Sequence, residues 1–271
     1  MLGRTELTSA LARLETRWGS AAVRLGGTPD GQTPVSGSLA LAPSPAAPAP
    51  PQPAGEVLPT GFAALDALLG SGGLPRGVSV SLRGGRSSGK TTLALHCLAQ
   101  AQAQGAIVAF LDFGGTFDPL EAAARGVDLH WLLVLRPVDL LEGFELGAAL
   151  VNGHQLDMLV VDLPARLAPR HEQAMRRLLA HARRQSVRLI VLEPGTAERS
   201  APGALADALA LRLELEQRAW LRAGRDVVGR RVRVRVAKNR FGPPGREAEL
   251  EIRYLVDGEH APAVDRFAAP A

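Results

Sequence analysis

The chain has 271 residues, 46% of them hydrophobic and only 4% aromatic, enough for one large α/β domain with a core of Leu, Val and Ala, plus an appendage. Its formal net charge is only +4, and its single cysteine excludes an intramolecular disulfide and fits a reducing compartment. No apolar stretch approaches the roughly 18 residues of a membrane span, and the first residues lack the apolar run of a signal peptide. We therefore expect a soluble, cytoplasmic protein without a membrane partner.

The first 56 residues predict a tethered arm rather than a part of the core. Residues 5–18 predict an amphipathic helix, because apolar side chains recur at helical spacing along one stripe: Leu7, Leu11, Leu14 and Trp18. A short apolar segment follows at 21–25, and residues 28–56 contain eight prolines among Ala, Ser, Gly and Gln. We assign 1–27 as a helix–strand oligomerisation arm that lies on its own core or on a neighbouring subunit, and 28–56 as a disordered linker.

Residues 57–257 predict the core domain, which a tail at 258–271 follows. Apolar runs predict strands at 77–83, 106–112, 131–136, 157–162 and 187–192. Helical patterns lie between them at 89–104, 119–125, 139–153 and 171–185. This alternation indicates a mostly parallel, twisted sheet with helices on both faces. After residue 205, apolar and polar residues alternate at 209–217, 230–238 and 247–255, which predicts an antiparallel extension.

The strongest motif is GGRSSGKT at residues 84–91, which matches G-x-x-x-x-G-K-[ST]. Its glycines let backbone N–H groups surround phosphate oxygens, Lys90 reaches the terminal phosphates, and the hydroxyl of Thr91 can bind Mg²⁺. A predicted strand precedes the loop and a predicted helix follows it, as the motif requires. We assign ATP and Mg²⁺ as cofactors, and these nucleotide-binding residues: Gly84, Gly85, Arg86, Ser87, Ser88, Gly89, Lys90, Thr91 and Thr92. The alternative is a loop that keeps its shape but has lost its affinity.

Two acidic residues end apolar strands and are candidates for the metal site. Asp162 closes the run MLVVD and is assigned with Thr91 to Mg²⁺, which it would hold directly or through water. Asp112 ends the run AIVAFLD, where a role in capping the strand end explains it nearly as well.

The segment from Arg218 to Arg253 is basic, with eleven Lys or Arg against four Asp or Glu. In its middle, Arg231, Arg233 and Arg235 share one face of a strand, and valines take the other face. These arginines could contact phosphate, which leaves weak DNA binding open. A solvated basic face, or an exposed edge strand protected by charge, explains them equally well.

The sequence as a whole resembles the RecA recombinase family. The similarity runs through TGFAALDALLGSGGLPRG, SSGKTTLALH, FLDFGGTFDP, GVDLHWLLVLRP and LDMLVVDL, and it resumes at DVVGRRVRVRVAKNR. It covers about residues 20–255 apart from the proline-rich linker, and the N-terminal arm resembles the RecA arm that packs on the next protomer. The resemblance implies a RecA-like P-loop core and a RecA-like subunit as partner, either a second copy of the chain or the host's RecA.

Some departures from the family pattern concern the parts that split ATP. Gly114 stands where RecA proteins carry the glutamate that activates the attacking water, and a missing general base typically costs about 10² to 10⁴ in rate. Glu121 stands where the family stacks an aromatic ring on adenine, although Asp118 is kept and could bond the adenine amino group. The family's Asn-Gln pair that senses the γ-phosphate is Glu193-Pro194 here. The resemblance therefore implies weak or absent ATPase activity.

Other departures concern DNA and the neighbouring subunit. The two DNA-binding loops of the family are reduced, after Asp162 and after Leu192, and we expect the family's C-terminal domain to be missing. The K-N-K segment that reaches a neighbour's ATP phosphates in RecA filaments keeps both of its cations, as Lys238, Asn239 and Arg240. This segment implies a contact across a subunit interface, or else it is a basic strand end with no partner.

A RecA-like core with these losses resembles the ImuA family, whose members act with ImuB and an error-prone DnaE-type polymerase in damage-induced mutagenesis. Our leading hypothesis is therefore a non-catalytic or weakly ATP-hydrolysing accessory protein of DNA repair and SOS translesion mutagenesis. It would be bacterial and cytoplasmic, and associated with the nucleoid when it acts. The alternative is an active DNA-dependent ATPase that binds single-stranded DNA and promotes homologous recombination. A third interpretation is a structural scaffold with an empty phosphate loop.

Overall fold

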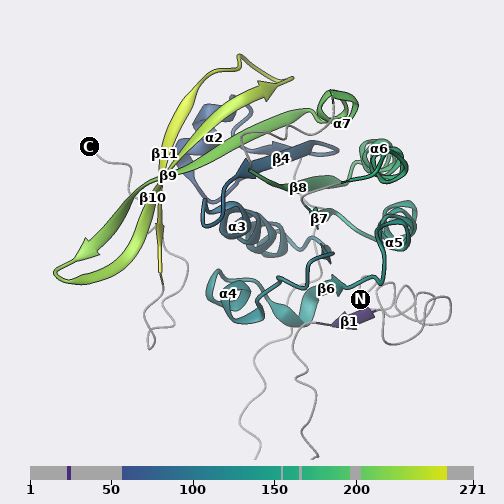
Figure 1. Ribbon diagram of the computed structural model, residues 1–271, viewed down its shortest axis with the longest axis horizontal. Coiled ribbons are helices and arrows are strands. Elements are labelled where there is room, and N and C mark those ends of the chain that lie inside the picture. Colours follow the sequence, from purple (N-terminus) through teal and green to yellow (C-terminus); the bar gives the residue numbers. More distant parts are fainter. Residues whose placement is uncertain (1–22, 26–56, 154, 165–166, 196–202, 255–271) are drawn as a thin grey trace, which may run out of the picture.

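The computed structural model describes residues 23–25, 57–153, 155–164, 167–195 and 203–254. Figure 1 shows a twisted sheet with helices on both faces and a long antiparallel extension at one end, which confirms the predicted α/β class. The predicted helix at 5–18 lies outside the described residues, with its stripe of Leu7, Leu11, Leu14 and Trp18. The predicted linker at 28–56 and the tail at 258–271 also lie outside them.

Nine strands of the described residues form one sheet, in the order β1-β6-β5-β7-β8-β4-β9-β10-β11. All five predicted core strands are present, namely β4 (Ser79–Gly84), β5 (Val108–Asp112), β6 (Leu132–Leu135), β7 (Met158–Asp162) and β8 (Arg188–Pro194). Neighbouring strands from β6 to β9 pair in parallel. A separate antiparallel pair joins β2 (Val57–Leu58) to β3 (Leu74–Pro75).

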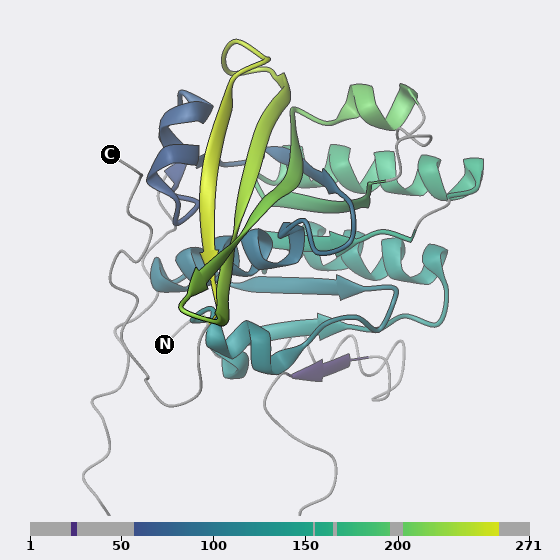
Figure 2. The same cartoon turned by 60° about the vertical axis from the view of Figure 1, so that its left-hand side comes forward.

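Helices cover both faces of the sheet, as Figure 2 shows. One layer holds α2 (Ala63–Leu69), α3 (Lys90–Ala103) and α4 (Pro119–Ala124), and the other holds α5 (Leu140–Asn152), α6 (Pro169–Arg184) and α7 (Gly203–Ala208). A 3₁₀ turn, Leu129–Trp131, leads into β6. Among the described residues, no helix is both long and apolar enough to cross a bilayer.

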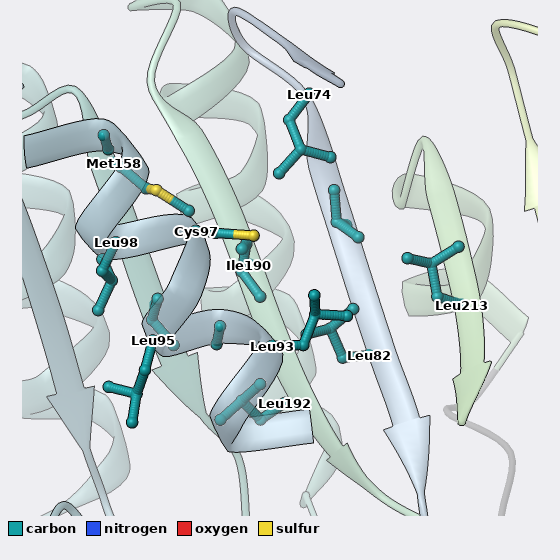
Figure 3. Packing of buried hydrophobic residues seen from close by; sticks show 14 of the residues in the cluster. Leu74, Leu82, Leu93, Leu95, Cys97, Leu98, Met158, Ile190, Leu192 and Leu213 are labelled. Atoms are coloured by element: carbon teal, nitrogen blue, oxygen red, sulfur yellow. The ribbon is translucent and has the colours of Figure 1, made fainter. Parts of the chain in front are cut away.

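Two hydrophobic cores result, because the inner strands are apolar on both faces. In β7, for example, the residues Met158 to Val161 are all fully buried and alternate between the two cores. Figure 3 shows the core beneath α3, where Leu93 and Cys97 lie close to Leu82 and Ile190. This packing fixes the start of α3 over the end of β4, where the phosphate loop lies.

The strand of the N-terminal arm lies on the chain's own core. β1 (Val23–Leu25) pairs antiparallel with β6, with Val23 opposite Leu135 and Leu25 opposite Leu133. It therefore covers the edge of the sheet that β6 would otherwise leave exposed. The sequence leaves open whether this segment lies on its own core or on a neighbouring subunit. In the single chain, β1 lies on its own core.

The antiparallel extension is confirmed as β9 (Leu211–Ala223), β10 (Asp226–Asn239) and β11 (Glu247–Arg253). One face of β10 places Val232, Val234 and Val236 in the same core as α2 and α3, where all three are fully buried. The three strands thus curve over the α3 side of the molecule (Figure 1). They bring the C-terminal part of the core against the phosphate loop.

The arginine face of β10 forms ion pairs with its two neighbouring strands. Arg231 pairs with Glu249 and Glu251, Arg233 with Glu216 and Glu247, and Arg235 with Glu214 and Glu247. The interpretation of this strand as an exposed edge is wrong, because β10 lies between β9 and β11. Cross-strand charge pairing explains the alternating arginines instead.

The parallel order brings the candidate site together. The strands β4, β5, β7 and β8 all end at the same edge of the sheet, where Asp112 is opposite Asp162 and Gly84 is opposite Pro194. In open α/β sheets, ligands bind in the crevice outside the carboxyl ends of the strands. The phosphate-loop motif and both strand-end acids therefore meet at the edge where a nucleotide is expected.

Candidate functional site

The phosphate loop connects the end of β4 to the start of α3, as its motif requires. Gly89 caps α3 with φ of +91°, and Ser87 is also left-handed with φ of +59°. A Cβ atom added at Gly89 would lie 2.6 Å from Cδ1 of Ile252 in β11. Glycine is therefore required at residue 89 both by its backbone angle and by the C-terminal strands that pack against it. Gly85, Arg86 and Ser87 stay exposed.

Lys90 folds back into the loop. Its Nζ donates hydrogen bonds to the carbonyl oxygens of Gly84 at 2.6 Å and Gly85 at 3.0 Å, and to Oγ of Ser88 at 3.5 Å. Burial lowers the pKa of Lys90, and the charge of Asp162 opposes that shift. The ammonium group thus sits in a partly desolvated position, where bound phosphate would supply the missing counter-charge.

The predicted metal residues lie at this same edge. Thr91 is exposed in the first turn of α3, and Asp162 accepts a hydrogen bond of 2.7 Å from the hydroxyl of Thr116. Burial raises the pKa of Asp162, the Thr116 hydrogen bond lowers it, the charge of Asp112 raises it, and that of Lys90 lowers it. Mg²⁺ commonly binds one or two carboxylates together with phosphate oxygens and waters. One carboxylate and one exposed hydroxyl at the same edge of the sheet fit this pattern of ligands.

Asp112 serves the strand end, in agreement with the capping alternative. Its two carboxylate oxygens accept hydrogen bonds from the backbone N–H groups of Thr116 and Phe117 and from Nε of Arg136, and the residue is only 2% exposed. The loop that it holds contains Gly114, which is exposed. The carboxylate of Asp112 is therefore occupied by hydrogen bonds, and the glycine at position 114 has no carboxylate.

Glu121 belongs to a network that ties three elements together. Its Oε1 accepts from Nε of Arg125 at 2.9 Å and from the hydroxyl of Thr92 at 3.4 Å. Arg125 is buried, and its Nη1 donates to the carbonyl of Arg253 at the end of β11. Thr92 is therefore buried beneath α4, behind the loop, and Glu121 compensates the charge of a buried arginine.

Asp118 is the N-cap of α4. Its Oδ1 accepts hydrogen bonds from the backbone N–H groups of Leu120 at 2.9 Å and Glu121 at 3.3 Å. This cap accounts for the residue within the chain. Its expected contact with an adenine amino group stays a prediction.

Glu193 and Pro194 lie against β4. Glu193 is buried and accepts a hydrogen bond of 2.6 Å from the hydroxyl of Ser81. Pro194 is opposite Gly84, and the N–H of Gly195 donates to the carbonyl of Gly84. The pair therefore braces the base of the phosphate loop.

The basic segment at the end of β10 forms hydrogen bonds within the chain. Nζ of Lys238 donates to the carbonyls of Ala206 and Asp207, and Nη2 of Arg240 also donates to that of Asp207. Asn239 donates to the carbonyl of Leu69. Because they bind carbonyl groups of the end of α7, these cations have partners within the chain.

The sequence pattern did not single out two residues at the C-terminal strands, Arg230 and Tyr254, as part of the site. Nη1 of Arg230 donates to the carbonyl of Ser87, and its guanidinium lies 5.3 Å from the ring centre of Tyr254. Arg230 shares the inward face of β10 with Val232, not the outward face of Arg231. One signal in the sequence could have revealed Arg230. It is a cation on the face of β10 that otherwise carries the buried valines.

We predict that Gly89→Ala destabilises the loop while Gly85→Ala does not. The backbone at position 89 is left-handed, and the new methyl group would collide with Ile252. We therefore expect a loss of about 1–3 kcal/mol in the free energy of unfolding. At position 85 nothing lies within 4 Å of an added Cβ atom. Urea unfolding of both variants measures the difference, and equal stabilities would contradict this packing.

Known proteins are similar to this chain over most of its length. A family model described as the RecA N-terminal domain matches residues 51–191. The chain is 35% identical to Protein RecA of Leifsonia xyli subsp. xyli, over 94% of this chain and 73% of that protein. It is 34% identical to Protein RecA of Roseiflexus sp., over 92% of this chain and 72% of that protein. The chain therefore belongs to the RecA family, as its motifs predicted.

Proposed function

We propose that this RecA-family protein binds ATP with Mg²⁺ in its phosphate loop, hydrolyses ATP slowly or not at all, and serves DNA repair as an accessory subunit. One observation carries the proposal. The loop keeps Lys90 and Thr91, whereas the nearby carboxylates of Asp112, Glu121 and Glu193 are engaged in hydrogen bonds that hold the fold together.

The residues present suit a nucleoside triphosphate. The carbonyl contacts of Lys90 can be exchanged for stronger, charge-assisted contacts to phosphate oxygens. The first turn of α3 offers N–H groups without helical partners, and the positive end of the helix favours an anion. Bound Mg²⁺ would neutralise phosphate charge, with Thr91 and Asp162 as its protein ligands.

An aromatic surface for the base is available from another element than expected. Glu121 replaces the family's aromatic ring and pairs with Arg125. Tyr254, the only tyrosine of the chain, lies against the Arg230 guanidinium that contacts the loop. A tyrosine ring there offers the flat apolar face on which a base stacks.

Slow hydrolysis follows from the lack of a suitable general base. A base must reach the attacking water within hydrogen-bonding distance. Gly114 has no side chain, Asp112 already accepts three hydrogen bonds, and Asp162 is the expected metal ligand. Among the described residues of this edge, no carboxylate occupies the position of the family's glutamate.

A contact with a RecA-like neighbour, either a second copy or the host's RecA, is supported by the position of Lys238 and Arg240. Lys238 is opposite Arg212 of β9, and Arg212 is opposite Ser81, three residues before the loop begins at Gly84. Lys238 is eight positions along β10 from Arg230, which contacts the loop, and this spacing is on the order of 26 Å in a strand. These cations therefore cannot serve their own loop, but they could serve the loop of the next subunit in a head-to-tail assembly.

Direct DNA binding is expected to be weak. The arginines that face outward on β10 are each matched by glutamates on the adjoining strands, which reduces the positive field available to phosphate. An accessory role with an ImuB-like protein and an error-prone polymerase, as in the ImuA family, fits a subunit that keeps the nucleotide site without a strong DNA-binding surface.

We predict that the protein binds ATP–Mg²⁺ with micromolar affinity and that Lys90→Ala weakens binding about 100-fold, because it removes a desolvated charge from the phosphates. Calorimetric titration measures the affinity, with Arg170→Ala on α6 as a control that leaves it unchanged. Phosphate release should stay at least about 100-fold below that of a RecA protein, with or without single-stranded DNA.

Each alternative has its own outcome in these assays. Hydrolysis that single-stranded DNA stimulates would contradict the proposal and favour an active recombinase. No binding of ATP by the unaltered protein would contradict it too, and would favour a structural scaffold. Tight binding that Lys90→Ala leaves unchanged would show that the nucleotide binds elsewhere.

We predict that the double variant Lys238→Ala with Arg240→Ala captures its partner at least about fivefold less well, whether the partner is the host's RecA, the polymerase or a second copy. We expect the same loss for Leu11→Asp in the arm. Loss of charge removes the contact to a neighbour's phosphates, and the arm variant removes an apolar anchor. Pull-down with each bait, at matched melting temperature, measures the effect. Unchanged capture in both variants would refute the interface.

A further inference from the structure

Arg230 is the cation that the C-terminal strands place beside the phosphate loop. It pairs across the sheet with Trp220 of β9 and Ile252 of β11. Ile252 is the residue that packs against Gly89. The backbone that carries Arg230 is therefore fixed relative to the loop by close contact, and only its side chain extends over the loop.

The contacts of Arg230 use only part of its hydrogen-bonding capacity. Nη1 donates to the Ser87 carbonyl, and the guanidinium lies against the ring of Tyr254. Its Nε is buried and has no hydrogen-bond partner among the described residues. A guanidinium offers five N–H donors in a planar fork that matches phosphate oxygens. An unpaired, buried donor of a charged group costs free energy unless a ligand satisfies it.

The charge of the site gives a second reason for a ligand. A nucleoside triphosphate that binds one Mg²⁺ keeps a net negative charge, and Lys90 supplies a single positive charge. Asp162 adds a negative charge at the same edge of the sheet. Lys238 and Arg240 are at the other end of β10 and bind carbonyls of α7. Arg230 is thus the cation of β10 that reaches the loop of its own chain.

We propose that Arg230 is a nucleotide-binding residue, whose guanidinium binds phosphate oxygens of the nucleotide held by the loop of the same chain. The inference rests on the proposed binding of ATP. Tyr254 keeps the guanidinium over the loop, and the Ser87 carbonyl holds it there before nucleotide arrives. The loop and the C-terminal strands then share one ligand.

The test is titration with a fluorescent ATP analogue, N-methylanthraniloyl-ATP, with Mg²⁺. Arg230→Gln keeps an N–H donor for the Ser87 carbonyl but removes the charge, so we expect affinity to fall about tenfold. Its melting temperature without nucleotide should match that of the unaltered protein. The difference in affinity should shrink as salt increases, because ionic strength screens a partly exposed charge.

The matched control is Arg231→Gln. Arg231 is the next residue of β10, on the opposite face, where Glu249 and Glu251 pair with it. We expect its nucleotide affinity to equal that of the unaltered protein. Arg230→Lys keeps the charge, and its affinity should stay within about threefold.

The outcomes separate this inference from the proposed function. If the unaltered protein binds the analogue and Arg230→Gln binds it equally well, Arg230 only holds the loop, and the inference is wrong while ATP binding stands. If the unaltered protein does not bind the analogue, the proposed function fails and the inference fails with it. Should the glutamine variant be too unstable to titrate, a tenfold loss in Arg230→Lys would contradict the contribution of charge.

Discussion

The contact between Gly89 and Ile252 is the constraint on which the candidate site depends. It places the last strand of the core directly on the phosphate loop, so close that only a glycine fits at the start of α3. Because β10 and β11 are paired, this contact also fixes Arg230 and Tyr254 beside the loop. The extension is thus one wall of the site, and a nucleotide in the loop would contact residues from both ends of the core.

The acidic residues around the loop are engaged in hydrogen bonds and ion pairs that join elements of the fold. Asp112 holds the loop that contains Gly114, Glu121 pairs with the buried Arg125, and Glu193 accepts from Ser81. Each of these carboxylates stabilises a connection between elements, and each would lose that contact by moving to activate a water. The proposed role, in which the protein binds a nucleotide and splits it slowly or not at all, rests on these contacts.

Most of the fold could be predicted from sequence, because fully buried parallel strands such as MLVVD leave continuous apolar runs and the phosphate loop has a fixed pattern. The role of β10 could not. Its Arg-Val alternation indicates one charged face, but whether that face is an edge, a DNA surface or an ion-paired strand depends on which strands lie beside it. Arg230 was missed for the same reason, since its contact with Ser87 joins residues distant in sequence.

The most direct test of the account is to restore the missing carboxylate. Gly114 is exposed and does not need a left-handed backbone, and an added Cβ atom would meet only Thr116, at 3.2 Å. We predict that Gly114→Glu raises the rate of phosphate release from ATP at least about 100-fold at unchanged affinity, whereas Gly114→Gln does not. Tight ATP binding with no gain in rate in Gly114→Glu would contradict the claim that this one lost base separates binding from hydrolysis.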